Sequence, residues 1–115
     1  MLDNNIFKIE VFIPENYVDT LRDNLNKIRT LSIGGNYDSC MSCVKVLGYW
    51  RPLKGADPFE GKIGELCKAY EMKVEFACKK KLLEDTLKTI KKIHPYEEPV
   101  INVIPMYTFK DFISE

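Results

Sequence analysis

Four stretches of this chain have the residue pattern of β-strands, and apolar and polar residues alternate most regularly in residues 6–13 and 71–79. A period of two places successive side chains on opposite faces of a strand, so each stretch is expected to form a half-buried β-strand. In the third stretch, Met72, Val74, Phe76 and Cys78 are expected to face inward. The predicted strands cover residues 6–13, 37–50, 71–79 and 100–107.

Two other stretches repeat their apolar residues at the spacing of an α-helix, and they predict helices over residues 15–29 and 80–93. Pro95 disfavours helical backbone at the residue before it, so the second helix should stop at His94. Residues 108–115 are expected to form a short tail with one helical turn. The apolar positions are Val18, Leu21, Leu25 and Ile28 in the first helix and Leu83, Leu87 and Ile90 in the second.

The order β-α-β-β-α-β predicts an α+β ferredoxin-like sandwich, with a four-stranded antiparallel sheet and both helices on one face. At 115 residues, the whole chain (1–115) is expected to be a single domain. The other sheet face has no helix, and an apolar face of that kind usually meets a partner. The apolar residues expected on this bare face are Ile6, Phe12, Met41, Leu47 and Ala77.

Charge and hydropathy exclude several classes of partner. Lys plus Arg and Asp plus Glu both total 17, so the formal net charge is zero. This balance argues against binding to nucleic acid or to an anionic membrane surface. The sequence has no apolar stretch near the ~20 residues that span a bilayer, and residues 1–5 do not resemble a signal peptide. A cytoplasmic location is therefore expected.

The four cysteines include a pair, Cys40 and Cys43, at the spacing of zinc-binding and redox motifs. On a regular strand these two side chains would point to opposite faces, and cytoplasmic thiols are mostly reduced. Four reduced structural thiols without zinc are therefore expected. Metal binding and redox chemistry remain the alternatives.

The run His94-Pro95-Tyr96-Glu97-Glu98-Pro99 concentrates the candidate chemistry. One imidazole and two carboxylates, those of His94, Glu97 and Glu98, suit a metal or an acid–base cluster. The structural alternative is a tight turn, in which Tyr96 packs and one glutamate accepts backbone N–H groups.

Strand directions place this turn near the end of the second predicted strand. The predicted ligand or interface residues are therefore His94, Tyr96, Glu97, Glu98, Trp50 and Tyr49, while Tyr37 and Cys40 are expected to serve in packing.

Several motifs together resemble the YqfO-like domain, which is inserted into many bacterial Nif-three-like dinuclear-metal-centre proteins and is similar in fold to CutA and PII. The resemblance implies a homotrimer with the bare sheet faces turned inward, and a loop over residues 48–64 that folds over its own or a neighbouring subunit. The motifs are Gly35-Asn36-Tyr37-x-x-Cys40, Gly48-x-Trp50-x-Pro52-x-x-Gly55-Ala56-x-Pro58, Gly61, Gly64-Glu65 and the 94–99 run.

The metal ligands of the larger relatives lie in flanking halves, which this chain with its single histidine does not supply. The predicted function is therefore a non-catalytic, oligomeric binding or regulatory module of the PII/CutA-like kind, without a cofactor. Its expected partner is another copy of itself, with a small molecule or a metal ion as a further ligand. The alternative is a divalent-metal-binding or metal-tolerance protein that uses His94 and nearby carboxylates, and a small-molecule enzyme is the third class.

Overall fold

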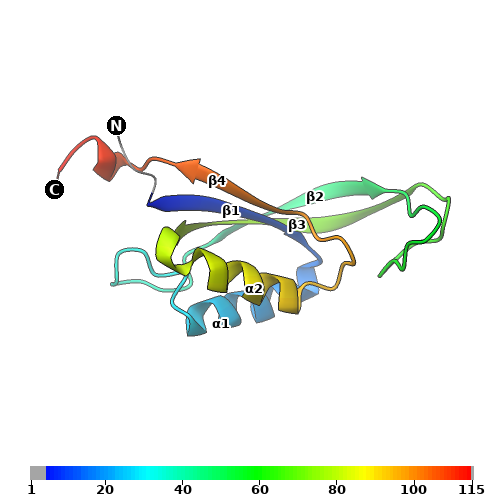
Figure 1. Cartoon of the computed structure of the whole chain (residues 1–115), viewed down its shortest axis with the longest axis horizontal. Coiled ribbons are helices and arrows are strands. Elements are labelled where there is room, and N and C mark those ends of the chain that lie inside the picture. Colours follow the sequence, from blue (N-terminus) through cyan, green and yellow to red (C-terminus); the bar gives the residue numbers. More distant parts are fainter. Residues whose placement is uncertain (1–4, 115) are drawn as a thin grey trace.

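The elements follow the predicted order in the computed structural model, which describes residues 5–114. The strands pair antiparallel in the order β2-β3-β1-β4. Both helices cover the same face of this sheet, so the ferredoxin-like sandwich is confirmed (Figure 1). The elements are β1 (Ile6–Ile13), α1 (Val18–Lys27), β2 (Ser42–Trp50), β3 (Cys67–Lys79), α2 (Leu83–Ile93) and β4 (Ile101–Met106), with short 3-10 turns at Glu15–Tyr17, Lys80–Leu82 and Phe109–Asp111.

The core lies between the sheet and the two helices, and its apolar residues other than Leu31 are ones that the two periodicities place inward. Each large apolar side chain that is fully buried contributes roughly 1.5–3 kcal/mol to folding. The hydroxyl groups of Thr30 and Thr86 are also fully buried here and hydrogen-bond each other at 2.7 Å. The buried apolar residues are Ile9, Val11 and Ile13 of β1, Val74, Phe76 and Cys78 of β3, Leu21 and Leu25 of α1, Leu31, and Ile90 of α2.

Two element boundaries differ from the prediction because single residues adopt left-handed backbone. Arg29 has a φ of +64°, and α1 ends before it, at Lys27 rather than at residue 29. Ser39 has a φ of +59°, which breaks the extended run, so β2 begins at Ser42 rather than at residue 37. Cys40 therefore precedes the strand, and the geometric reason given for separating it from Cys43 does not apply.

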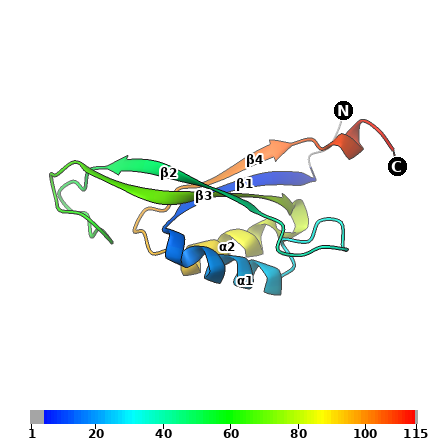
Figure 2. The ribbon, with the colours of Figure 1, turned by 180° about the vertical axis from the view of Figure 1, so that it is seen from behind.

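A two-stranded arm projects from the sheet. Residues 72–79 of β3 pair with β1, but residues 67–71 continue along β2 beyond the end of β1, so β3 is longer than predicted. Figures 1 and 2 show this arm at one end of the molecule, and the start of β1 and the segment after β4 at the other. The radius of gyration is 16.1 Å, above the about 13 Å expected for a compact domain of this length.

The bare sheet face carries other apolar residues than predicted, because β2 turns its other side, with Val44 and Val46, to it. The β-sheet register sets Cys43 opposite the buried Val74, and Leu47 opposite Tyr70, so Leu47 lies on the helix side. Met41 also packs against the core rather than lying on the bare face. Ile6, Phe12 and Ala77 do lie on the bare face, since their neighbours in β1 and β3 point into the core.

Charged residues occupy the centre of the bare face. Lys8 and Lys73 each contact both Glu10 and Glu75, with N–O distances between 3.1 and 3.5 Å. The pKa of Glu10 is lowered, and the hydrogen bond from Asn102 is the largest cause. The pKa of Glu75 is also lowered, and the hydrogen bond from Lys8 is the largest cause. The prediction of an apolar bare face is therefore wrong at its centre, where four charges neutralise one another.

No helix within residues 5–114 has the length and apolar character required to cross a membrane.

Candidate functional site

A groove of about 710 Å³ lies between the 94–99 turn and the loop of residues 51–66 that joins β2 to β3. The tip of this loop turns back from the arm toward the segment that follows α2 (Figure 1). Aromatic side chains form much of the wall: Phe12, Tyr49, Trp50, Phe59 and Tyr96. Its charged residues are Arg51, Lys54, Glu60, Glu71, Glu97 and Glu98.

His94 fixes the start of the turn from behind the groove. Pro95 follows it, and His94 takes extended backbone with φ −65° and ψ 128°, so α2 ends at Ile93 as predicted. Its Nε2 lies 2.6 Å from the carbonyl oxygen of Phe12, which can only accept, so this nitrogen carries the proton. Its Nδ1 accepts the N–H of Tyr96 at 3.3 Å. Both ring nitrogens are therefore engaged in the neutral form, and burial lowers the pKa of His94.

Glu97 joins the turn to the loop. Its Oε1 accepts the backbone N–H of Asp57 at 2.9 Å, a bond between residues forty positions apart. Phe59, in the same loop, packs against two other rings. Its ring centroid lies 5.9 Å from that of Tyr96 and 6.4 Å from that of Tyr17. These contacts hold the loop over the end of β1 and close one side of the groove.

Tyr96 makes a second connection, to the arm. Its hydroxyl donates to Oε1 of Glu71 at 3.2 Å, and burial, followed by the charge of Glu71, raises the pKa of the phenol. Gly48 lies beside this pair, and a Cβ at that position would clash with the Glu71 carboxylate. A glycine inside a strand often marks a close approach of this kind. Gly48 thus leaves the space in which Glu71 meets Tyr96.

Trp50 is held at the base of the loop. Its indole N–H donates to the carbonyl oxygen of Glu60 at 3.1 Å. Gly61 has a φ of +101°, and a Cβ there would lie 3.2 Å from the indole nitrogen and 2.7 Å from the sulfur of Cys67. The glycine therefore allows the loop to pass over the indole.

The structure places five of the six predicted residues along the groove: Tyr49, Trp50, Tyr96, Glu97 and Glu98. The sixth, His94, supports the turn and does not line it. That these residues form a binding site stays a prediction.

Sequence reasoning missed Phe12, Phe59 and Glu71 as groove residues. Phe12 could have been found, because it is the last outward-facing residue of a strand that ends where the turn was predicted to lie.

The metal hypothesis finds little support in this geometry. Within residues 5–114, no three His, Cys, Asp or Glu side chains come close enough to share an ion. A metal at His94 would have to displace the bond to Phe12 or to Tyr96. All four cysteines are free thiols, and burial raises the pKa of Cys43 and Cys78, which makes both less nucleophilic.

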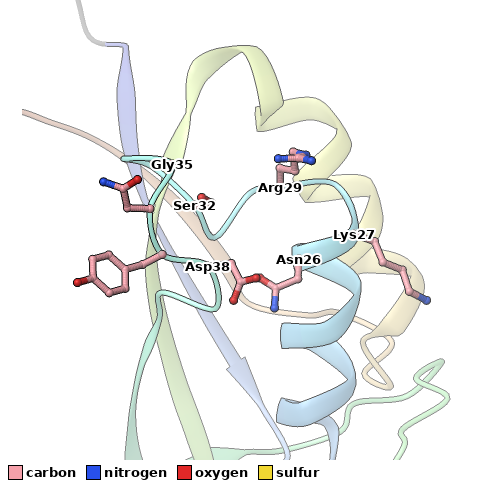
Figure 3. A pocket seen from close by; sticks show the side chains of 8 residues that line it. Asn26, Lys27, Arg29, Ser32, Gly35 and Asp38 are labelled. Carbon is pink, nitrogen blue, oxygen red and sulfur yellow. The ribbon is translucent and has the colours of Figure 1, made fainter.

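A second, polar hollow of about 360 Å³ lies between the end of α1 and the loop that carries the Gly35-Asn36-Tyr37 motif (Figure 3). Asn26 points from α1 toward this loop, where its amide donates to the Ser39 hydroxyl at 2.7 Å and accepts the Ser39 N–H at 2.9 Å. Tyr37 is 80% exposed, so its predicted packing role is wrong. The polar bonds of Asn26 hold the loop, and the tyrosine is left in solvent.

Comparison with known proteins identifies relatives of this domain. No family model matches the chain. It is 37% identical over 100 residues to a GTP cyclohydrolase 1 type 2 homolog of Staphylococcus epidermidis, and 31% identical over 99 residues to the one of Bacillus subtilis. These matches cover 87% and 86% of the chain but 27% and 26% of the relatives. The chain thus spans about a quarter of the length of the curated relatives it matches.

Solved structures agree with this relationship. A Bacillus cereus protein related to NIF3 superposes with a TM-score of 0.77 at 25% identity, over 94% of this chain and 27% of that one. The periplasmic divalent cation tolerance protein CutA from Archaeoglobus fulgidus superposes with a TM-score of 0.68 at 15% identity, over 93% and 90% of the two chains. The second similarity concerns the fold alone.

Proposed function

Since the chain is a YqfO-like domain of the kind carried by NIF3-related proteins, with the fold of CutA, we propose that it is a non-catalytic binding module that works as a homo-oligomer. The groove beside the arm is its contact site. A trimer is the expected assembly, because the resemblance to PII and CutA implies one.

The observation that carries this proposal is how the groove uses its polar groups. Glu97 binds the Asp57 N–H, Glu71 binds the Tyr96 hydroxyl, and His94 uses both ring nitrogens. Each of these groups is engaged in a bond that holds the groove in shape. What remains open to a partner is mainly aromatic and apolar surface.

Self-association is supported by the distribution of exposed apolar side chains. On the arm and its loop, Tyr49, Leu53 and Tyr70 are each more than 60% exposed. At the opposite end of the molecule, Phe112 is 69% and Ile113 is 62% exposed. Exposed apolar patches on an otherwise ordinary polar surface mark interaction sites.

The proposal is tested by mass and by probe binding. Light scattering at micromolar concentration should give a multiple of the 13.4 kDa chain mass, three times that mass for a trimer. Trp50 is the chain's single tryptophan and lines the groove, so its emission reports occupancy there. The probe 8-anilinonaphthalene-1-sulfonate should accept energy from Trp50 when it enters the groove.

Two matched variants give the controls. Leu53→Ser removes an exposed apolar side chain from the groove, and Val44→Ser removes one from the bare sheet face. Energy transfer should fall in the first variant and persist in the second. A monomer mass together with transfer that is insensitive to Leu53→Ser would overturn the proposal.

A further inference from the structure

Aromatic rings of the groove are held in place by bonds within the chain. The Trp50 indole N–H donates to the Glu60 carbonyl oxygen at 3.1 Å. The Tyr96 hydroxyl donates to Glu71 at 3.2 Å, and the Tyr96 ring packs against Phe59 with centroids 5.9 Å apart. Phe59 is nevertheless 52% exposed, so it offers ring surface to a ligand in the groove. Because the rings are already held, stacking on them costs little conformational entropy.

The groove also gathers negative charge. Four of its lining residues carry carboxylates, and none of the four forms an ion pair within residues 5–114. Over the same residues, the side chains of Glu60 and Glu98 form no hydrogen bond either. Burial raises the pKa of Tyr96 most, and the charges of Glu71 and Glu60 raise it further, so both carboxylates lie near this ring. The four carboxylates are those of Glu60, Glu71, Glu97 and Glu98.

Two basic side chains in the lining, Arg51 and Lys54, compensate this charge only in part. Both are exposed, and neither contacts a carboxylate at ion-pair distance in the part of the chain that the structure describes. Four carboxylates against two basic groups leave an excess of two negative charges. Charge complementarity therefore favours a cationic ligand over an anionic one.

Rings and carboxylates together favour one kind of cation. A guanidinium is planar, stacks on aromatic faces, is more weakly hydrated than an ammonium, and can give two parallel N–H bonds to one carboxylate. A metal ion suits the groove less well, because no three His, Cys, Asp or Glu side chains converge within residues 5–114. The volume of about 710 Å³ lies within the ~300–1,000 Å³ of small-molecule pockets, which favours a small ligand.

We propose that the groove binds a small organic cation of the guanidinium class. Its planar charged group stacks on the aromatic rings, and its N–H groups donate to the carboxylates of Glu60 and Glu98, which no other side chain engages within residues 5–114. The apolar remainder of the ligand packs on Leu53, which is 67% exposed and lines the groove. This inference rests on the proposed function and names the ligand class of that site.

The first test compares two probes of the same shape, phenylguanidinium and its neutral counterpart phenylurea. The emission of Trp50, the single tryptophan, reports both titrations. Phenylguanidinium should bind roughly 5-fold or more tightly, because a cation–π contact and a charged hydrogen bond add to the stacking that both probes make. Benzenesulfonate, an anion of similar size, should bind more weakly than either. Equal affinity for phenylguanidinium and phenylurea would contradict the inference.

Charge-neutral variants test which groups select the cation. The double variant Glu60→Gln/Glu98→Gln removes two charges and keeps the shape of both side chains. The ratio of the two affinities should fall by roughly three-fold or more, since hydrogen bonds to a charged acceptor are the stronger ones, while phenylurea binding persists. The matched control is Glu65→Gln, in the same loop but outside the groove lining, which should leave the ratio unchanged. A ratio that survives the double variant would overturn the assignment.

Two further outcomes separate this inference from its alternatives. A capped peptide with one arginine between two glycines offers the same charged group as a protein partner would, and it should bind more weakly than phenylguanidinium; tighter binding of the peptide would overturn the small-molecule assignment. If 8-anilinonaphthalene-1-sulfonate enters the groove but phenylguanidinium has no advantage over phenylurea, the inference is wrong and the binding module stands. A monomeric chain whose groove takes up none of these probes removes both.

Discussion

At the scale of single residues, the one histidine of this chain has a structural rather than a reactive role. His94 is buried and gives both ring nitrogens to backbone groups of the strand and the turn that it joins. Histidine was the residue type that most suggested reactive chemistry in the sequence, but in the structure His94 positions the turn beside the groove. Its neighbours Glu97 and Glu98 remain at the surface.

The buried state of His94 predicts a pH dependence of stability. Burial lowers its pKa in the folded chain, whereas the unfolded chain takes up a proton near the usual value of 6.5. The unfolded state therefore binds more protons below that pH, and the free energy of unfolding falls as the pH drops from about 6.5 toward the lowered pKa. Urea unfolding between pH 5 and pH 8 measures this.

The matched control is His94→Gln, which has no group that titrates in this range. In this variant the decline below pH 6.5 should be absent, although the variant is less stable at every pH. Glu10 and Glu75, whose pKa values are lowered, contribute stability that is lost only at more acidic pH. An equal decline in the variant would assign the pH dependence to the carboxylates.

The buried hydroxyl pair gives a second residue-scale prediction. Thr30 and Thr86 are each fully buried and satisfy each other. Thr86→Val leaves the Thr30 hydroxyl without its partner and should cost about 1–3 kcal/mol of unfolding free energy. The double variant Thr30→Val/Thr86→Val removes both polar groups and should recover part of that loss. Urea unfolding of all four combinations gives the coupling, and purely additive losses would contradict it.

At the scale of elements, the loop at the tip of the arm depends on a small number of polar bonds. Glu97→Ala removes the acceptor of the Asp57 N–H, a bond worth about 1 kcal/mol. Amide hydrogen exchange in residues 53–63 should become roughly five-fold faster, because local opening becomes easier by that amount. Core amides of β1 should be unaffected.

Glu98→Ala is the control for this prediction, since Glu98 is equally exposed but makes no hydrogen bond or ion pair recorded within residues 5–114. Its exchange pattern should match that of the unmodified chain. Faster exchange of the loop in both variants would show that the charge of the turn, not the bond to Asp57, holds the loop.

Elements were predictable from the sequence where periodicity determines them. The inward faces of β1 and β3 follow from alternation, because one buried face fixes every second residue. The face of β2 was not predictable, because its exposed positions carry apolar residues such as Val44 and Leu47 on both sides. The left-handed conformations of Arg29 and Ser39, which end α1 and delay β2, carry no signal in residue type, since neither is glycine.

The candidate site was predictable in part. Strand directions suffice to place the 94–99 turn near the end of β2, so Tyr49 and Trp50 were named correctly as neighbours of the turn. The contact of Glu97 with Asp57 depends on how an irregular loop folds back, and no periodicity encodes that. Glu71 was missed for a similar reason. Its contact with Tyr96 depends on the space that Gly48 leaves on the neighbouring strand, and no periodicity encodes that space.

At the scale of the whole molecule, we expect folding not to depend on assembly. The core between the helices and the sheet is complete within one copy, and its largest side chains are fully buried there. We therefore expect a dissociated copy to keep its secondary structure. Circular dichroism should be the same on both sides of the concentration at which light scattering shows dissociation, whereas loss of signal on dilution would mean that folding and assembly are coupled.

The ion-pair network on the bare sheet face has a consequence for newly synthesised copies. A flat apolar face would adhere to any similar face, and such unselective stacking leads to aggregation. Lys8, Lys73, Glu10 and Glu75 interrupt the apolar surface at the centre of this face, and their four charges sum to zero. A partner that packs on this face must therefore keep these ion pairs satisfied, because a buried charge without its partner is costly.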